Sequence, residues 1–370
     1  MPPAIVDTYL NHVRQSVAAY GPRTLVLLEC GSFYEIYDVV PTEASAHLRC
    51  CRDVLGILVT RKNKGDPKSA YMAGIPTQSI RRYFKLLLQR NYTVVVIGQK
   101  GTPNNITRDV TQVLSPGCNL SEEVHESTDA GQSVLAALLF EDAPTGDGDC
   151  YAYLATFDTN RGTTHLETVT VDATTSGSAR HVMDDLCTAL HETLQTHLFH
   201  ELCVYHQRAP ASDHHERLGK SVADFVRQWR SAGKLVHHTP DTTKLAHVFA
   251  PTFQREFLER VYPQYTSAFC SVEESLGLQC VDRPMLATLV LLLQWIKKHD
   301  TRLVADLARP TSHQGLVKGT ADATVGAGVA RRNTLFFQAQ DKGNKKNGRG
   351  NIGERTPMGA LGPQFHPPFI

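Results

Sequence analysis

Hydrophobic and polar positions alternate along the first 118 residues in a way that predicts a small mixed α/β domain. Apolar residues in the first segment recur at helical spacing, and Gly21-Pro22 ends that helix. The apolar run that follows is typical of a buried strand, and a later β-branched run is typical of another. The predicted elements are a helix at 4–18, a strand at 24–29, helices at 43–54 and 78–90, and a strand at 92–100.

A polar linker at 121–131 leads into a second unit, in which three strands come first and helices then alternate with strands. The turn-rich segments DAPTGDGD and DTNRG separate the first three strands, which predicts antiparallel neighbours. This order resembles a ribonuclease-H-like layout. The predicted elements are strands at 134–140, 151–157 and 165–171, a helix at 178–199, a strand at 201–206, a helix at 216–231 and a strand at 234–238.

From residue 242 onward the pattern becomes all-helical. The apolar run 285–296 is too short to span a bilayer and predicts a buried helix at 284–298. After Pro310 the periodicity fades, and the abundance of Gly, Pro, Asn, Lys and Arg predicts a basic tail without regular structure. The predicted segments are an α/β domain at 1–118, a second α/β unit at 125–240, the start of a helical domain at 242–310 and the tail at 311–370.

Composition adds few constraints. A net charge of +1 over 370 residues indicates no partner, because a nucleic-acid binder needs clustered basic residues. The nine cysteines include no CxxC pair, which argues against a zinc ribbon or a disulfide framework and favours a reducing, intracellular compartment. The seventeen histidines lack a matching ligand set, so we expect no metal site. No targeting pattern separates nucleus, cytoplasm, viral factory or organelle.

The stretch CGSFYEIYD, residues 30–38, places an aromatic residue and a carboxylate two positions apart after a glycine. In an extended segment Phe33 and Glu35 share one face, roughly 6–7 Å apart, while Tyr34 and Ile36 point back to the core. An exposed ring can stack on a nucleic-acid base, worth about 1–3 kcal/mol, and the carboxylate can accept from a base edge. The alternative is a core aromatic residue beside a solvated glutamate.

Five segments stand in a fixed order around this stretch: GSFYEIY (31–37), LGILVTRK (55–62), YMAGIP (71–76), VVVIGQK (94–100) and TRDVTQVLSPG (107–117). Together they resemble the N-terminal mismatch-recognition domain of the MutS family of DNA mismatch-repair proteins. Tyr71 stands where that family usually has proline, and Gly98-Gln99 where it usually has Glu-Gln. Two stretches resemble the branch of large DNA viruses and octocoral mitochondria, namely GSFYEIY and SLGLQCVDRPMLATLVLLLQWIKKHD.

The resemblance implies a fold and a site. The fold would be a mixed-sheet first domain, a ribonuclease-H-like connector and the start of an all-helical core domain. Phe33 would be the wedge that stacks on a mispaired or unpaired base from the minor groove, and Glu35 would hydrogen-bond that base. A mismatch has already lost pairing and stacking, so the cost of inserting a wedge is lower there.

Basic residues near these segments are candidates for contacts to the DNA backbone. Phosphate contacts position a protein on DNA without specifying sequence. The alternative for the 61–70 loop is a solvated, turn-rich segment, and the alternative for Arg108 is a structural role. The candidates are Arg61, Lys62, Lys64, Lys68 and Arg108.

A nuclease is a competing interpretation, because Asp158 ends a strand of the ribonuclease-H-like unit. Such an enzyme needs several carboxylates that converge on metal ions. Asp158-Thr159-Asn160 has instead the pattern of an Asx turn. The other acids of this region lie mostly in a loop or on a helix: Asp142, Asp147, Asp149, Asp184 and Asp185.

The MutS family also carries a C-terminal ATPase, whereas no GxxxxGK[ST] motif occurs here. We therefore expect no enzyme activity and no cofactor for this chain alone, with ATP and Mg²⁺ needed only in a full-length family member. The expected partner is duplex DNA with a mismatch or small loop, full-length members act as dimers, and no membrane is involved. A further alternative is a scaffold fragment whose connector docks a repair partner.

Overall fold

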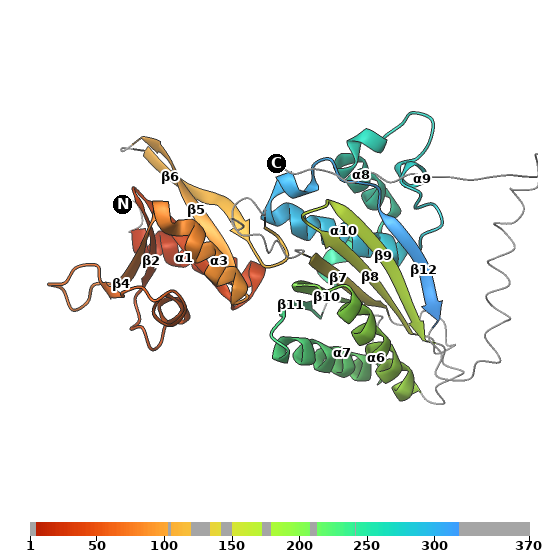
Figure 1. Ribbon diagram of the computed structural model, residues 1–370, viewed down its shortest axis with the longest axis horizontal. Coiled ribbons are helices and arrows are strands. Elements are labelled where there is room, and N and C mark those ends of the chain that lie inside the picture. Colours follow the sequence, from red (N-terminus) through yellow and green to blue (C-terminus); the bar gives the residue numbers. More distant parts are fainter. Residues whose placement is uncertain are drawn as a thin grey trace, which may run out of the picture. The chain divides into compact units, whose positions relative to one another are not determined.

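The computed structural model describes residues 5–102, 105–119, 134–141, 150–171, 179–207, 213–240 and 242–317 (Figure 1). These residues form two mixed six-stranded sheets with helices packed against them. The linker 121–131 and residues 318–370 of the predicted tail lie outside the described part of the chain. Among the described helices, none is both long enough and apolar enough to cross a lipid bilayer.

The first sheet has the strand order β3-β4-β2-β1-β5-β6, in which β1 and β5 are parallel and the other neighbours antiparallel. Its central strand β1 is fully buried from Leu25 to Leu28, as its apolar run predicted. The strands are β1 (Thr24–Cys30), β2 (Phe33–Asp38), β3 (Thr60–Arg61), β4 (Tyr71–Pro76), β5 (Thr93–Thr102) and β6 (Asn105–Leu114). The helices are α1 (Ile5–Tyr20), α2 (Ala46–Arg49) with a π-helical turn (Cys50–Val54), and α3 (Ile80–Gln89).

The hydrophobic pattern predicted neither β4 nor β6. Gly74 and Pro76 lower the intrinsic strand preference of β4, and polar residues dominate the exposed middle of β6. Both segments become strands because β2 and β5 offer them backbone partners, with Glu35 opposite Gly74 and Gln99 opposite Arg108. The partner of β4 is distant in sequence and that of β6 is the preceding strand, and in neither case does the periodicity of the segment itself show the pairing.

The second sheet has the order β11-β10-β7-β8-β9-β12. Three antiparallel strands come first, and β10 and β11 then continue the sheet in parallel beside β7, in the order that the sequence predicted. The strands are β7 (Val134–Glu141), β8 (Cys150–Asp158), β9 (Thr163–Val171), β10 (Glu201–Gln207), β11 (Leu235–Thr239) and β12 (Thr311–Val317).

Helices cover both faces of this sheet (Figure 1). On one face, α6 (Ala179–Thr196) and α7 (Asp213–Ser231) pack over the side chains of Val134, Ala136 and Leu138. On the other face, the almost entirely buried α10 packs over Leu135, Ala137 and Leu139. The helical elements after β11 are η3 (Thr243–Phe249), α8 (Pro251–Val261), η4 (Pro263–Tyr265), α9 (Val272–Ser275), α10 (Arg283–His299) and η5 (Thr301–Val304).

Two sequence expectations are corrected here. The helices between 242 and 304 share a hydrophobic core with the second sheet, because the wide apolar surface of α10 needs an equally wide apolar partner. The predicted tail begins later than residue 311, since residues 311–317 form β12, which pairs in parallel with β9. Backbone hydrogen bonds to an open sheet edge stabilise this strand, and its polar residues carry no periodic signal for it.

Candidate functional site

Phe33 is the first residue of β2 and follows a tight turn at Gly31-Ser32. Gly31 has a φ of 61°, a left-handed conformation that glycine adopts without strain. The Phe33 side chain is 45% exposed, and its Cδ1 atom lies 3.7 Å from the position that a Cβ on Gly74 would occupy. The ring therefore lies beside the backbone of Gly74 and is exposed at the end of β2, as the Gly-Ser turn before it predicted.

Phe33, Glu35 and Tyr37 alternate along β2 and share one face, and their burial increases in that order. Glu35 is partly buried, and Tyr37 is only 1% exposed. The Tyr37 hydroxyl donates a hydrogen bond to Oε2 of Glu35. On the opposite face Ile36 is fully buried, as expected, but Tyr34 remains partly exposed.

Two basic residues at the base of the 61–70 loop have intramolecular partners. Arg61 donates to the Ser69 carbonyl at 3.0 Å and to the Tyr71 hydroxyl at 2.9 Å, and its guanidinium lies 4.5 Å from the centre of the Tyr71 ring. Lys62 places its Nζ 4.7 Å from the centre of the Tyr37 ring and 3.4 Å from the Tyr37 hydroxyl. Both side chains therefore stabilise the loop and its contact with the sheet.

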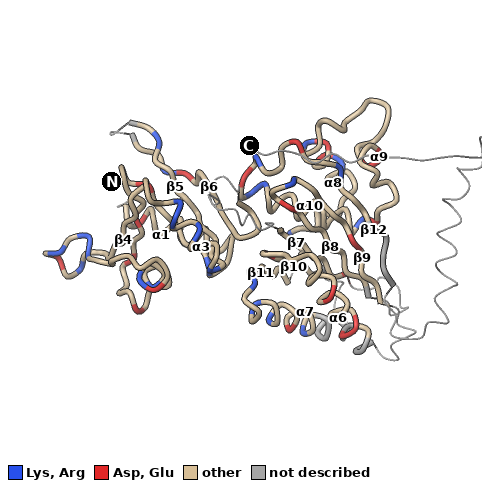
Figure 2. The backbone as a smooth tube through the Cα atoms, viewed as in Figure 1, with Lys and Arg blue, Asp and Glu red and all other residues tan. Residues whose placement is uncertain are grey.

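Lys64 and Lys68 lie further out on the same loop, where both are exposed. Figure 2 shows basic residues along this loop between β3 and β4. The loop also carries Asp66, whose carboxylate accepts from the Lys68 backbone N–H at 2.8 Å. These two lysines are the members of the predicted basic set whose charges are best placed for an external partner.

Arg108 lies on β6, opposite Gln99 of β5. It adjoins the Cys30 thiol, which also lies beside Glu35. Burial and the adjacent Glu35 raise the pKa of Cys30 to about 11, against the opposing effect of the Arg108 guanidinium. Arg108 Nε is buried, and no acceptor among the described residues reaches it.

Tyr37 contacts both Glu35 and Lys62, and Phe33 lies on the same face of β2. Arg108 approaches this face through Cys30. Sequence reasoning missed Tyr37 and Cys30. A signal for Tyr37 was available, because it stands two residues after Glu35 in an extended segment. Nothing in the local sequence indicated Cys30, whose neighbours come from two other strands.

Asp158 supports a turn. Its carboxylate accepts from the backbone N–H groups of Asn160 at 2.9 Å and Arg161 at 3.3 Å, which confirms the predicted Asx turn. Asp184 and Asp185 lie on α6. Within the described residues no group of three or more His, Cys, Asp or Glu side chains is arranged to hold a metal ion. The remaining acids of the nuclease hypothesis, Asp142, Asp147 and Asp149, lie outside the described residues.

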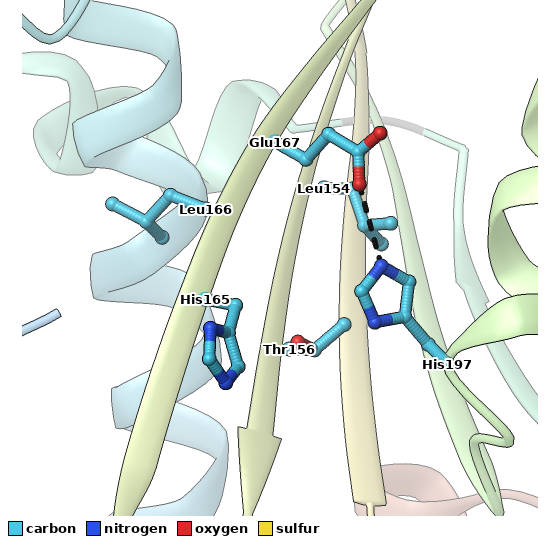
Figure 3. Close-up of a pocket in the computed structure, with 6 residues that line it drawn as sticks. All are labelled: Leu154, Thr156, His165, Leu166, Glu167 and His197. Carbon is cyan, nitrogen blue, oxygen red and sulfur yellow. Dashed lines mark hydrogen bonds and ion pairs between the residues drawn. The ribbon is translucent and has the colours of Figure 1, made fainter. Parts of the chain in front are cut away.

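A small pocket of about 160 Å³ lies against β8 and β9 of the second sheet (Figure 3). His197 Nε2 lies 3.3 Å from Glu167 Oε2, and Thr156 lies between His165 and His197. Packing against the sheet and the contact between His197 and Glu167 give these side chains structural roles. The lining residues are Leu154, Thr156, His165, Leu166, Glu167 and His197.

Comparison with known proteins defines the class of the first domain. Residues 13–123 match the family model described as MutS domain I. The DNA mismatch repair protein MutS of Rickettsia akari is 30% identical over 142 residues, which cover 36% of this chain and 15% of that protein. DNA mismatch repair protein MutS 1 of Haloarcula marismortui is 32% identical over 133 residues, which cover 36% of this chain and 13% of that protein.

Residues 13–123 of this chain are therefore similar to MutS domain I, in agreement with the five sequence segments. The matched region spans about 15% of the length of the Rickettsia relative. Two RuvC structures from Thermus thermophilus, one in complex with a Holliday junction substrate, cover 46% of this chain and 96% of their own chains. Their identities are 14% and 12% and their TM-scores 0.28 and 0.29, which is too low a similarity to define a fold.

Proposed function

We propose that this chain recognises mispaired or unpaired bases in duplex DNA during mismatch repair. The observation that carries the proposal is the 45% exposed Phe33 ring beside Glu35, in a domain that matches MutS domain I. At 45% exposure and at a strand end, the Phe33 ring is available to stack on a base, an interaction worth about 1–3 kcal/mol per base.

In this proposal Phe33 inserts from the minor groove and unstacks one base step. Unstacking costs a few kcal/mol per step, and a mismatched or unpaired base has already lost part of its stacking and pairing. Glu35 accepts a hydrogen bond from the displaced base. On intact DNA the same carboxylate is repelled by the phosphates and finds no donor, which penalises the matched duplex.

The basic residues divide into two groups under this proposal. Lys64 and Lys68 contact phosphates and supply binding that is independent of sequence. Arg61 chiefly holds the loop, since its guanidinium already has two acceptors and a stacked ring. Arg108 is a further candidate for a DNA contact, because it lies on β6 within the region that matches MutS domain I.

The second unit is proposed to be a ribonuclease-H-like connector without catalytic activity. The strand order β9-β8-β7-β10-β11, antiparallel first and then parallel, supports this assignment. The turn-capping role of Asp158 supports a structural acid rather than a nuclease residue. Mismatch binding by this chain is proposed to need neither ATP nor Mg²⁺.

Fluorescence anisotropy with the full chain tests this function on a G·T duplex, a single-base-bulge duplex and a matched duplex, at low and near-physiological salt. We expect tighter binding to the first two, and Phe33→Ala should remove that preference while leaving the salt-dependent background. Phe269→Ala is the matched control, because Phe269 is 98% exposed but lies in the loop before α9. Equal binding of the unaltered chain to all three duplexes would overturn the proposal.

A further inference from the structure

The Tyr37 hydroxyl is fixed by the core of the first domain. Its ring packs edge-on against Tyr9 of α1, with ring centres 5.7 Å apart and an angle of 74° between the planes. Tyr9 is itself fully buried, and its hydroxyl donates to the Val26 carbonyl of the central strand at 3.1 Å. The donor that reaches Glu35 therefore stands on rigid, packed elements, which is what precise positioning of a binding group requires.

Lys62 places a positive charge beside the Tyr37 hydroxyl. Its Nζ lies 3.4 Å from the Tyr37 hydroxyl and 4.7 Å from the centre of the Tyr37 ring. The backbone of Lys62 is also fixed, because its N–H donates to the Ala70 carbonyl at 2.8 Å and closes the base of the loop. A cation over an aromatic face is attracted to it, so the ammonium is held beside Tyr37.

We propose that Tyr37 and Lys62 are positioning residues for Glu35. Tyr37 holds one carboxylate oxygen of Glu35, Lys62 holds the Tyr37 hydroxyl, and the carboxylate is thereby oriented to accept from a displaced base. This inference rests on the proposed function, in which Glu35 contacts the base. It assigns Lys62 to the protein's own Tyr37, whereas the sequence suggested a phosphate contact.

Burial and the adjacent Glu35 raise the pKa of Tyr37 well above its ordinary value, so the phenol keeps its proton and remains a donor throughout the working pH range. A glutamate that is free to rotate loses side-chain entropy when it is ordered against a base. Because Tyr37 orders Glu35 in the free protein, less side-chain entropy is lost when DNA binds. The same order keeps the carboxylate facing a matched duplex, where it is repelled.

Tyr37→Phe isolates the hydroxyl, because the ring keeps its contacts with Tyr9 and Lys62. We expect the ratio of mismatch to matched affinity to fall by about threefold to tenfold, the size expected for one hydrogen bond. In a Glu35→Ala background the same change should have no effect on that ratio, since Tyr37 acts through Glu35. Tyr34→Phe is the matched control, on the opposite face of the same strand, and should leave the ratio unchanged.

Lys62 is tested by rescue. Lys62→Met should lower the ratio, and Lys62→Arg should restore it, because arginine keeps the charge and stacks well on an aromatic ring. Lys64→Met should instead weaken both duplexes equally, as expected for a phosphate contact. If Lys62→Met behaves like Lys64→Met, Lys62 is a phosphate contact and the inference is wrong for it.

The outcomes separate the two proposals. If the unaltered chain shows no mismatch preference, the proposed function fails, and this inference fails with it. If the preference exists and Phe33→Ala abolishes it, but Tyr37→Phe and Tyr34→Phe are indistinguishable, only the positioning role is overturned. Should Tyr37→Phe fail to fold, as judged by its thermal melt, the Lys62 series alone decides the inference.

Discussion

Exposure increases along one face of β2, from the buried Tyr37 through Glu35 to the exposed Phe33. The gradient follows from α1, whose Tyr9 covers Tyr37, and from the Gly31-Ser32 turn, which ends the strand pair at Phe33. Each side chain therefore has a different environment although the three share one backbone geometry. The buried tyrosine orders the glutamate, and the exposed ring remains available to a partner.

At this scale Glu35→Gln removes the charge and keeps an oxygen that can accept from Tyr37. We expect binding to matched DNA to rise, because the variant no longer repels the phosphates, and binding to the mismatch to fall by the value of one hydrogen bond to a charged group, roughly 1.5–3 kcal/mol. The gain on matched DNA should be largest at low salt, where charges are least screened.

Titrations of both duplexes at two salt concentrations measure the effect of Glu35→Gln. Phe269→Ala again serves as a control for surface changes far from the site along the chain. A uniform loss of binding to both duplexes would mean that Glu35 stabilises the fold and does not discriminate between bases.

At the scale of elements, one buried carboxylate joins the end of β6 to the second sheet. Glu201 begins β10 and is fully buried. It accepts from the Ser115 hydroxyl, from the Gly117 backbone N–H at 3.0 Å and from Trp295 Nε1 of α10 at 3.2 Å, and it pairs with His237 of β11. A Cβ on Gly117 would lie only 2.8 Å from the Glu201 Cβ, so only glycine at position 117 allows the backbone to approach Glu201 this closely.

Acid should weaken this junction. Burial raises the pKa of Glu201, but His237 and the other donors outweigh that effect and hold the pKa at about 2, below the ordinary value of 4.5. Because the folded-state pKa is the lower one, the stabilisation is complete above about pH 4.5 and is lost as pH falls toward 2. Glu201→Gln should cost roughly 3 kcal/mol or more, since the buried donors lose their charged partner.

Urea unfolding of the unaltered chain and of Glu201→Gln, followed between pH 2 and pH 7, measures this contribution. The difference between their free energies of unfolding should shrink as the pH falls below about 4.5. Glu167→Gln is the comparison, because Glu167 also pairs with a histidine but is partly exposed. If the difference in free energy of unfolding stays constant between pH 2 and pH 7, Glu201 is not the acid-sensitive group.

At the scale of the whole molecule, charge is nearly balanced, at +1 over 370 residues. Under the proposed function, long-range attraction to DNA is therefore weak, and binding depends on local basic groups such as those on the 61–70 loop (Figure 2). We expect modest affinity for matched DNA and a shallow dependence of affinity on salt.

The double change Lys64→Met/Lys68→Met should make the slope of log K against log salt less steep by roughly 0.9 for each phosphate that a lysine no longer neutralises. Binding to mismatched and matched duplexes should fall together, so their ratio should be unchanged. Lys220→Met, on α7 of the second unit, controls for removal of a surface charge elsewhere. An unchanged slope in the double variant would place the phosphate-binding groups on other residues.

Much of the architecture could be predicted from the sequence, and the exceptions share a cause. The β1 and β5 strands, the α1, α3 and α10 helices and the Asp158 turn each carry a local signal: an apolar run, a helical period or a turn residue. The β4, β6 and β12 strands carry little such signal. They form because a neighbouring strand offers hydrogen-bond partners, and that neighbour is distant in sequence for β4 and β12.

The sequence by itself determined the resemblance of the first domain to MutS domain I and the shared face of Phe33 and Glu35, because a motif and a period of two are local properties. Only the tertiary structure decided what surrounds that face. It brought Tyr9 onto Tyr37, Lys62 onto the same ring and Cys30 between Glu35 and Arg108. These contacts join residues from separate helices, strands and loops, and packing around a common core determines which of them meet.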